Sequence, residues 1–255
     1  MVEIIRAEHV SKKYGHRFNQ IDVLSNISFS IEKGEFVGIM GPSGAGKTTL
    51  LNSLATIDKP SSGKIWLDQQ EITGMREGKL SQLRQKKLGF IFQDFNLIDS
   101  LTVKDNILLP LSLQRVAVSE MEKRVKDLSG VLNIHSILER MPADISIGQK
   151  QRVAAARAMI TEPILLFADE PTGSLDSKSA TELLQHLTGL NKSYQTSILM
   201  VTHDAFTASY CQRILFIKDG VIFAELVKEN SRKEFFKQIM DMQMTIGGGQ
   251  FYADI

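Results

Sequence analysis

The stretch Gly41-Pro42-Ser43-Gly44-Ala45-Gly46-Lys47-Thr48 decides the fold of this chain. It fits the pattern G-x-x-x-x-G-K-S/T, in which a glycine-rich turn joins a buried strand to the start of a helix. The sequence supplies both neighbours, because the apolar run 35–40 precedes the motif and a helical pattern at 49–54 follows it. We therefore expect the backbone amides of this loop and the helix N-terminus to cradle phosphate groups.

Lys47 and Thr48 are the residues of this loop whose side chains would act on a nucleotide. Lys47 would contact the β- and γ-phosphates of ATP, and the hydroxyl of Thr48 would bind Mg²⁺. Thr49, the next residue, begins the expected helix and is counted with the nucleotide-binding residues. A glycine-rich turn without a ligand is the alternative, but the strand before it and the helix after it favour a phosphate site.

A carboxylate at the end of a second buried strand is the next requirement of such a site. Asp169 directly follows the apolar run 164–168, which suits it to hold the water shell of Mg²⁺. Glu170 is one residue further on, where it can orient or deprotonate an attacking water because the metal need not occupy it. Two acids could merely solvate the end of a strand. Together with the phosphate loop, however, they indicate hydrolysis of ATP.

Short apolar segments alternate with helical patterns along the chain, which is typical of an α/β protein with a largely parallel central sheet. The inner strands are expected at 35–40, 88–92, 164–168 and 197–201. An antiparallel edge sheet is expected from strands at 4–9 and 27–31, and a hairpin from strands at 213–218 and 221–226 around Asp219-Gly220. The fold class is therefore α/β: a P-loop ATPase core with a mostly parallel central sheet and an antiparallel β edge subdomain.

Helical periodicity dominates two other parts of the chain. Between about 94 and 150, apolar residues such as Met121, Val125, Leu128 and Leu132 recur every three or four positions, which predicts an inserted α-helical subdomain. A second amphipathic pattern at 231–244 places Phe235, Phe236, Ile239 and Met240 on one face. That helix would pack on its own domain or contact a partner. We expect a domain at 1–227 and a partly helical C-terminal extension at 228–255.

Composition narrows the class of protein. The 255-residue chain has 30 Lys plus Arg and 29 Asp plus Glu. Its net charge of +1 provides no global field to attract nucleic acid, so we expect no nucleic-acid partner. Cys211 is the single cysteine and cannot form an internal disulfide. The longest apolar segments are strand-sized, so we expect no membrane span and a cytoplasmic protein.

Further motifs follow one another in a fixed order. They are Tyr14, Gln93 after the expected strand 88–92, Ile145-Ser146-Ile147-Gly148-Gln149, Ser174-Leu175-Asp176, and His203. With the phosphate loop and the acidic pair, this order resembles the nucleotide-binding subunits of ATP-binding cassette (ABC) transporters, over about residues 3–226. Each residue alone has an ordinary explanation, such as a core position for Tyr14 or a structural hydrogen bond for His203. Their common order is far harder to explain without the resemblance.

The resemblance implies roles for the residues around the nucleotide. Tyr14 would stack on adenine. Gln93 would contact Mg²⁺ or its water, so the metal would be held by Thr48, Gln93 and Asp169. His203 would act with Gln93 and the general base in hydrolysis of ATP.

The resemblance also implies that two chains share each ATP. Ser146, Gly148 and Gln149 would form an anion site at a helix N-terminus. Because Lys47 already covers one side of the γ-phosphate, that site would bind the nucleotide of another copy, with Asp176 nearby. The chain carries one set of motifs, so a homodimer is the simplest assembly.

Ile147 departs from the family pattern, which has glycine at this position. A β-branched residue does not readily adopt positive φ, and it adds bulk beside the nucleotide. We expect closure of the dimer to weaken if that glycine is needed for space, and little change if position 147 points away from phosphate.

The segments 88–97 and 101–111 look like one branch of the family, which includes macrolide exporters, lipoprotein-release systems and peptide-antibiotic resistance transporters. The stretch 207–211 and the C-terminal Phe235-Phe236 favour the last group, the bacitracin- and nisin-type systems of Gram-positive bacteria. That resemblance implies a membrane permease, a place on the inner face of the cell membrane, and a sensor histidine kinase reached through the permease. A lipoprotein-release or cell-division system, or a soluble ABC ATPase, remains the alternative.

Overall fold

The computed structural model describes residues 2–15 and 19–247. The chain divides into two compact units, one formed by Met1–Met75 with Leu199–Ile255 (unit 1) and the other by Arg76–Ile198 (unit 2). Residues 248–255, the end of the expected C-terminal extension, lie outside the described residues. Within the described part of the chain, no helix is both long and apolar enough to cross a membrane.

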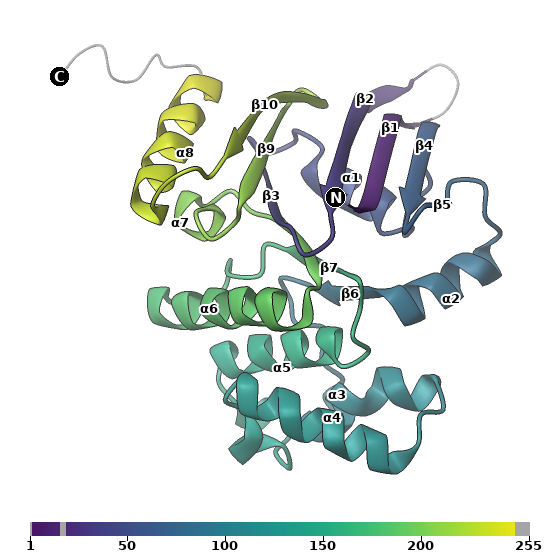
Figure 1. Cartoon of the computed structure of the whole chain (residues 1–255), viewed down its shortest axis with the longest axis vertical. Helices are drawn as coiled ribbons and strands as arrows, with labels where there is room; N and C mark the ends of the chain where they lie inside the picture. The colour runs from purple at the N-terminus through teal and green to yellow at the C-terminus, as the bar shows by residue number, and fades with distance from the viewer. Residues whose placement is uncertain (1, 16–18, 248–255) are drawn as a thin grey trace. The chain divides into compact units, whose positions relative to one another are not determined.

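The elements alternate between strands and helices, as expected of an α/β protein (Figure 1). The strands are β1 Glu3–Tyr14, β2 Ile21–Glu32, β3 Phe36–Met40, β4 Ser62–Leu67, β5 Gln70–Glu71, β6 Leu88–Ile91, β7 Leu165–Asp169, β8 Ser197–Val201, β9 Arg213–Lys218 and β10 Val221–Val227. The helices are α1 Lys47–Leu54, α2 Glu77–Lys87, α3 Val103–Leu113, α4 Val118–Val131, α5 Ile147–Met159, α6 Ser177–Tyr194, α7 Ala205–Ala208 and α8 Arg232–Ile246, with short 3₁₀ turns η1 His135–Ile137 and η2 Pro142–Asp144.

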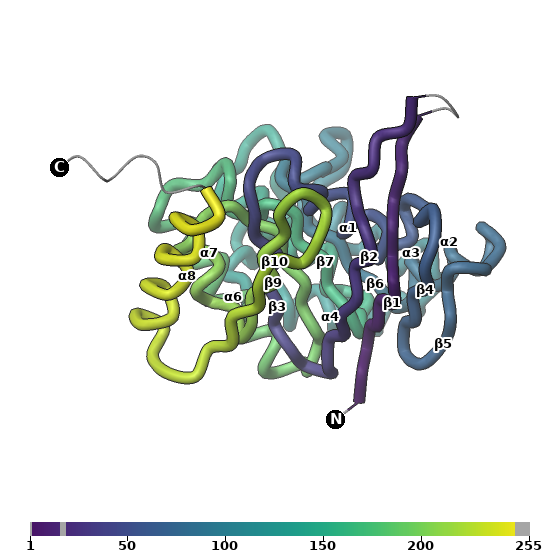
Figure 2. Tube along the Cα trace, turned by 90° about the horizontal axis from the view of Figure 1, so that it is seen from above, coloured from purple at the N-terminus to yellow at the C-terminus, as the bar shows by residue number. Residues whose placement is uncertain are grey.

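Unit 1 contains the antiparallel sheet, with strand order β2-β1-β4-β5. The long pair β1 and β2 runs from Glu3 opposite Glu32 to Tyr14 opposite Ile21, and Figure 2 shows the two strands side by side. The expected strands 4–9 and 27–31 are therefore confirmed, but both extend further. The extra length of β1 includes polar Lys12, which is 8% exposed and paired with Asp58, so apolar alternation alone could not predict it.

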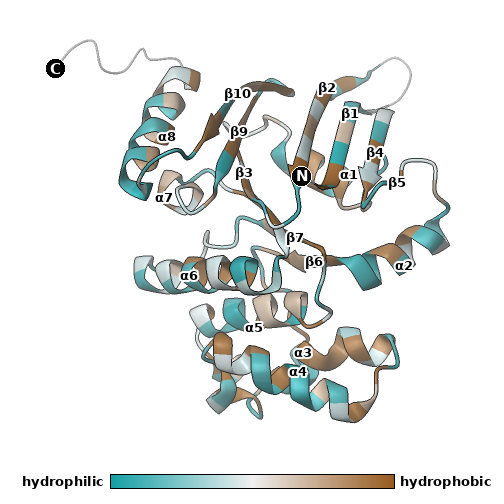
Figure 3. Ribbon diagram, viewed as in Figure 1, coloured by the Kyte–Doolittle hydropathy of each residue, from teal (hydrophilic) through white to brown (hydrophobic). Residues whose placement is uncertain are grey.

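Unit 1 also contains the strand that leads into the phosphate loop. All five residues of β3 are buried, which explains its continuous apolar sequence. It pairs in parallel with β9 and neighbours β8, whose residues from Leu199 on belong to this unit. The expected hairpin of β9 and β10 is confirmed, and Asp219 and Gly220 take φ of 50° and 75° at its turn. Figure 3 shows the apolar character of β9 and β10.

Unit 2 contains the parallel pair β6 and β7, in register from Leu88 opposite Leu165 to Ile91 opposite Ala168. Helices fill most of the rest of the unit, as the periodicity predicted. Val125 and Leu128 of α4 are buried, which confirms the face read from the sequence. The helix α2 was not predicted, because Leu83 is its single buried residue and an apolar period is absent.

The helix α8 packs against α7 of its own unit (Figures 1 and 2). Ser231 begins it with a capping box completed by Glu234. Phe235 and Ile239 are 1% and 0% exposed, but Phe236 is 36% exposed. The predicted apolar face is thus correct for Phe235 and Ile239 and wrong for Phe236, which lies on the solvent side of the helix.

Candidate functional site

The phosphate loop takes the conformation that its glycines allow. Gly46 is the N-cap of α1 with φ of 96°, in the left-handed region. A Cβ at Gly46 would lie 2.7 Å from the carbonyl oxygen of Val23, so both the conformation and the space require glycine. Gly44 also has positive φ, but a Cβ there would meet nothing within 4 Å. Glycine at position 44 is therefore favoured by its left-handed conformation and not by lack of space.

Lys47 is folded back over this loop. Its Nζ donates to the carbonyl oxygens of Gly41 and Pro42, both at 2.9 Å. The first turn of α1 contains no acidic residue, so no carboxylate there offsets the positive end of the helix dipole. The Lys47 ammonium adds a second positive charge beside the loop. Thr48 is exposed and Thr49 is half-buried at the start of the helix. This arrangement suits an anion with several oxygens.

Tyr14 lies at the end of β1, with 43% of its surface exposed, so it is not a core residue. Its hydroxyl donates to Asp58 Oδ2 at 2.5 Å, and the Thr49 side chain interacts with the same hydroxyl. The hydrogen bond to Asp58 raises the pKa of Tyr14, and partial burial acts in the same direction. Lys12 Nζ lies 4.8 Å from the centre of the ring. The ring is therefore held beside the helix that follows the phosphate loop, by partners that the sequence did not reveal.

His203 follows β8 in the same unit. The preceding Thr202 donates its backbone N–H to the Ile39 carbonyl at 3.1 Å, which places the His203 backbone beside the strand that feeds the phosphate loop. The imidazole is exposed. The carbonyl oxygen of His203 accepts a hydrogen bond from Gln243 Nε2 at 2.8 Å. Unit 1 thus brings together the phosphate loop, Tyr14 and His203.

Unit 2 carries the acidic pair. Asp169 ends β7, and Glu170 follows it with φ of 47°, a left-handed conformation that is uncommon for a residue other than glycine. Gly173 closes the next turn by donating its N–H to the Glu170 carbonyl at 3.0 Å. A Cβ on Gly173 would lie 3.4 Å from Gln93 Nε2. Gln93 therefore lies against the turn that holds Glu170.

Gln151 connects these two segments, although it belongs to none of the motifs found in the sequence. Its side chain is completely buried in α5, and Nε2 donates to the carbonyl oxygens of Phe92 at 3.2 Å and Pro171 at 2.8 Å. Phe92 immediately precedes Gln93, and Pro171 immediately follows Glu170. The sequence signal that could have revealed this role is a glutamine at a position that the helical period of α5 places on its buried face.

Ser146 is the N-cap of α5. Its hydroxyl accepts from the Gln149 backbone at 3.2 Å, and its own N–H donates to the Gln149 side chain at 2.8 Å, which completes a capping box. Ile147 is the first helical residue and is 52% exposed. It is absent from the residues with positive φ in the described chain. Isoleucine is therefore not strained by its backbone here, because the first turn of a helix needs no left-handed residue.

Position 148, unlike position 147, needs glycine because there is no space for a side chain. A Cβ there would lie 2.8 Å from Ser179 Oγ and 3.0 Å from Ser179 Cβ. Ser179 belongs to the first turn of α6, whose N-cap is Asp176. The Asp176 carboxylate accepts from the backbones of Lys178 and Ser179 at 3.0 and 3.1 Å and from Ser179 Oγ at 2.6 Å, and these bonds hold the pKa of Asp176 below its usual value. The two motifs Ile145–Gln149 and Ser174–Asp176 therefore lie side by side.

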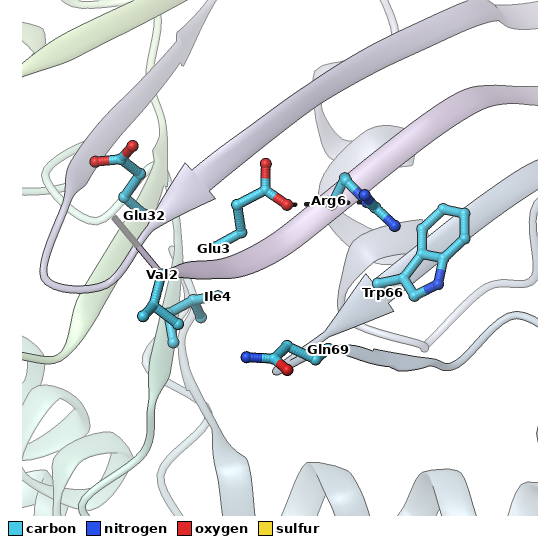
Figure 4. Close-up of a pocket in the computed structure, with 7 residues that line it drawn as sticks. All are labelled: Val2, Glu3, Ile4, Arg6, Glu32, Trp66 and Gln69. Atoms are coloured by element: carbon cyan, nitrogen blue, oxygen red, sulfur yellow. Dashed lines mark ion pairs between the residues drawn. The ribbon is translucent and has the colours of Figure 1, made fainter.

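A surface pocket of about 490 Å³ lies elsewhere in unit 1 (Figure 4). It is lined by Val2, Glu3, Ile4, Arg6, Glu32, Trp66 and Gln69. Figure 4 shows the Arg6 guanidinium beside the Trp66 ring, 4.4 Å from its centre, and paired with Glu3. The lining contains none of the predicted site residues.

Comparison with known proteins identifies the family. Residues 24–173 match the family described as ABC transporter. The chain is 52% identical over 248 residues to the bacitracin export ATP-binding protein BceA of Halalkalibacterium halodurans, which covers 97% of this chain and 98% of that protein. It is 42% identical over 228 residues to the lipoprotein-releasing system ATP-binding protein LolD of Aquifex aeolicus, covering 89% of this chain and 100% of that protein.

A solved structure supports the fold class. The ATP-binding cassette MJ0796 of Methanocaldococcus jannaschii, in a dimeric post-hydrolysis state bound to ADP and Pi, is similar with a TM-score of 0.81 and 35% identity. The similarity covers 89% of this chain and 100% of that one. The predicted ATPase core with a mostly parallel sheet is confirmed.

Proposed function

The chain belongs to the ABC transporter family and is an ATP-binding subunit that hydrolyses ATP; from this premise we propose that it drives a transporter conferring resistance to antimicrobial peptides of the bacitracin type. The observation that carries the proposal is the 52% identity to a bacitracin export ATP-binding protein along almost the full length of both chains. The similarity to the lipoprotein-releasing relative covers 89% of this chain. We propose residues 1–227 as the ATPase domain and 228–255 as a C-terminal extension.

In this proposal the phosphate loop holds the triphosphate. The backbone amides of residues 41–49, the α1 N-terminus and Lys47 bind the phosphate oxygens, and Tyr14 stacks on adenine. The donor set proposed for Mg²⁺ is the Thr48 hydroxyl, the Asp169 carboxylate and the Gln93 amide oxygen, and such hard oxygen ligands suit this ion. Bound Mg²⁺ would neutralise charge on the phosphates during hydrolysis.

Glu170 is the proposed general base. Its carboxylate follows the metal-binding position by one residue and accepts the proton of the attacking water. Gln93, which lies against the turn that follows Glu170, and His203 complete the catalytic set. The signature residues Ser146, Gly148 and Gln149, with Asp176 beside them, serve the nucleotide of a second copy of the chain.

Two kinds of partner follow from the proposal. A second copy forms the ATP-dependent homodimer, for which the dimeric structure of a similar cassette gives support. A membrane permease then converts closure and opening of the dimer into movement of the peptide or its lipid complex. The chain would lie on the inner face of the membrane, and a sensor histidine kinase would be reached through the permease.

Glu170→Gln tests the catalytic and physiological parts together. Because the amide keeps the shape of the side chain but cannot accept the proton, ATP turnover should fall by at least about a thousandfold while ATP binding persists. The host carrying this single change should become sensitive to bacitracin or nisin. Glu229→Gln, at an exposed position after β10, is the matched control and should leave both properties unchanged.

The second candidate function is lipoprotein release, favoured by the 42% identity to the relative of that name. The same strains separate the two. Unchanged sensitivity to a panel of antimicrobial peptides, with Glu170→Gln expressed and inactive, would contradict peptide resistance. Mislocalised lipoproteins in that strain would support the second candidate.

A further inference from the structure

The C-terminal helix α8 is bound to the segment that carries His203. Gln243 Nε2, near the end of α8, donates to the His203 carbonyl oxygen at 2.8 Å. Near the start of α8, the Arg232 guanidinium lies 4.3 Å from the centre of the Tyr210 ring and 5.6 Å from that of Phe206. Both rings follow His203 within eight residues along the chain, on and just after α7. Figures 1 and 2 show α7 and α8 side by side.

The backbone on either side of His203 is fixed by other bonds. Thr202 donates its N–H to the Ile39 carbonyl at 3.1 Å. Asp204 caps α7 by accepting from the backbones of Phe206 and Thr207 at 3.2 and 2.9 Å. The peptide group between His203 and Asp204 is held at both ends: its N–H donates to Thr202 Oγ1 at 3.1 Å, and its carbonyl oxygen accepts from Gln243 Nε2. The bond from Gln243 is the one of these two that comes from outside the segment 202–208.

The helix α8 is itself firmly anchored. Phe235 and Ile239 are buried on unit 1, and a capping box begins the helix. Lys218 Nζ donates to the Ile246 carbonyl at 3.1 Å, which ties down the last turn close to Gln243. Because the backbone of this helix is already ordered, the hydrogen bond costs only the rotamer freedom of the Gln243 side chain, so it can help to fix the conformation of its acceptor.

We propose that Gln243 is a positioning residue for His203, so that the C-terminal helix sets the orientation of the imidazole used in ATP hydrolysis. The proposal rests on the proposed function, because it assumes that His203 acts in hydrolysis. Without the bond from Gln243, the Thr202 hydroxyl alone would hold this peptide group, and the loosened backbone would let the imidazole leave its productive orientation. Nucleotide affinity, which we assign to the phosphate loop and Tyr14, should not depend on this bond.

The test is steady-state ATP hydrolysis by the purified full-length chain. Gln243→Glu is nearly isosteric and replaces the donor with an acceptor, and Gln243→Met removes the donor without adding charge. Each should lower kcat about fivefold, which equals about 1 kcal/mol at 1.36 kcal/mol per tenfold and matches the loss of one hydrogen bond. KM for ATP should stay within about twofold. Gln238→Glu, on the exposed side of the same helix, should change neither constant.

His203→Ala separates failure of this proposal from failure of the proposed function. If His203→Ala leaves kcat unchanged, the role of His203 in hydrolysis is wrong. If His203→Ala lowers kcat but both Gln243 variants behave as wild type, the positioning role is overturned. In the His203→Ala background, Gln243→Glu should have no further effect. A full additive loss, or a raised KM with unchanged kcat, would instead identify Gln243 as a general support of the fold or of nucleotide binding.

Discussion

Replacing buried Gln151 with methionine tests how the two catalytic segments of unit 2 are held. Methionine has nearly the length and volume of glutamine but donates no hydrogen bond. The change therefore removes the bonds to the carbonyl oxygens of Phe92 and Pro171 without creating a cavity. Arg157 still donates to Phe95 at 2.7 Å, so the segment after Gln93 keeps one anchor.

The expected loss of stability can be estimated from these contacts. The Phe92 carbonyl also accepts from the Phe95 backbone at 3.4 Å, so its loss is partly compensated. Leaving the Pro171 carbonyl buried without its donor costs about 1–3 kcal/mol. An opposing gain of roughly 1 kcal/mol arises because Gln151 Oε1 is itself buried without a hydrogen-bond partner, and methionine removes it. The net destabilisation should be about 1–2 kcal/mol.

Urea unfolding followed by circular dichroism measures this loss, and steady-state ATP hydrolysis measures its functional effect. The unfolding midpoint should fall with an unchanged slope, and kcat should fall because the neighbours of Gln93 and Glu170 are no longer joined. Gln149→Met in the same helix is not a suitable control, because Gln149 takes part in a capping box. Gln238→Met in α8 is suitable, since it is exposed. Unchanged kcat in a destabilised Gln151→Met would refute the functional connection, and unchanged stability would refute the energetic argument.

Four further predictions follow from single contacts. Gly148→Ala should lower the free energy of unfolding by about 1–3 kcal/mol in urea melts and also lower ATP turnover, because the added methyl group overpacks against Ser179, and Ser179→Gly in the same chain should restore part of both. Tyr14→Ala should weaken ATP binding by about 1 kcal/mol in calorimetry, whereas Tyr14→Phe should retain the affinity because the ring remains. Burial raises the pKa of Asp58, but hydrogen bonds from Lys12 and Tyr14 outweigh it and hold the pKa of Asp58 below its usual value. The stability it contributes should be present above about pH 4 and lost as the pH falls further, and Asp58→Asn should flatten the acid side of the melting-temperature profile. Ile147→Gly should raise ATP turnover by at most about tenfold, and a thousandfold rise would show that the native signature is crippled.

The parts of the fold with strong apolar patterns could be predicted from the sequence. The strands β3, β7 and β8 agree with the expected ranges within one residue, because strands buried on both faces read as continuous apolar runs. The strand β4 and the helix α2 could not be predicted in this way. Residues 62–67 mix glycine and lysine with the apolar positions, and α2 buries a single residue. Elements that bury so few side chains leave too weak a period to recognise.

The residues of the candidate site likewise fall into those that the sequence predicts and those that it does not. The phosphate loop and the acidic pair are visible in the sequence because phosphate and metal chemistry fixes both the residue types and their spacing. Gln151, Asp58 and Gln243 are not visible. Gln151 and Gln243 act on main-chain carbonyl groups, which any residue could provide, and Asp58 meets Tyr14 from 44 positions away. A contact whose partner is generic or distant leaves no local pattern.

Ile147 and Gly148 show that the effect of a missing glycine can be predicted only when the start of the helix is known. Ile147 departs from the family pattern, which has glycine there, and the sequence left open whether space or backbone conformation requires that glycine. The capping box at Ser146 instead starts the helix at Ile147, so its φ is helical and its side chain, 52% exposed, points outward. One residue later the same helix brings Gly148 against Ser179, where a Cβ would lie 2.8 Å from Oγ. The demand for glycine that this chain shows therefore lies at position 148, where it comes from the neighbouring helix, and not in the backbone conformation of residue 147.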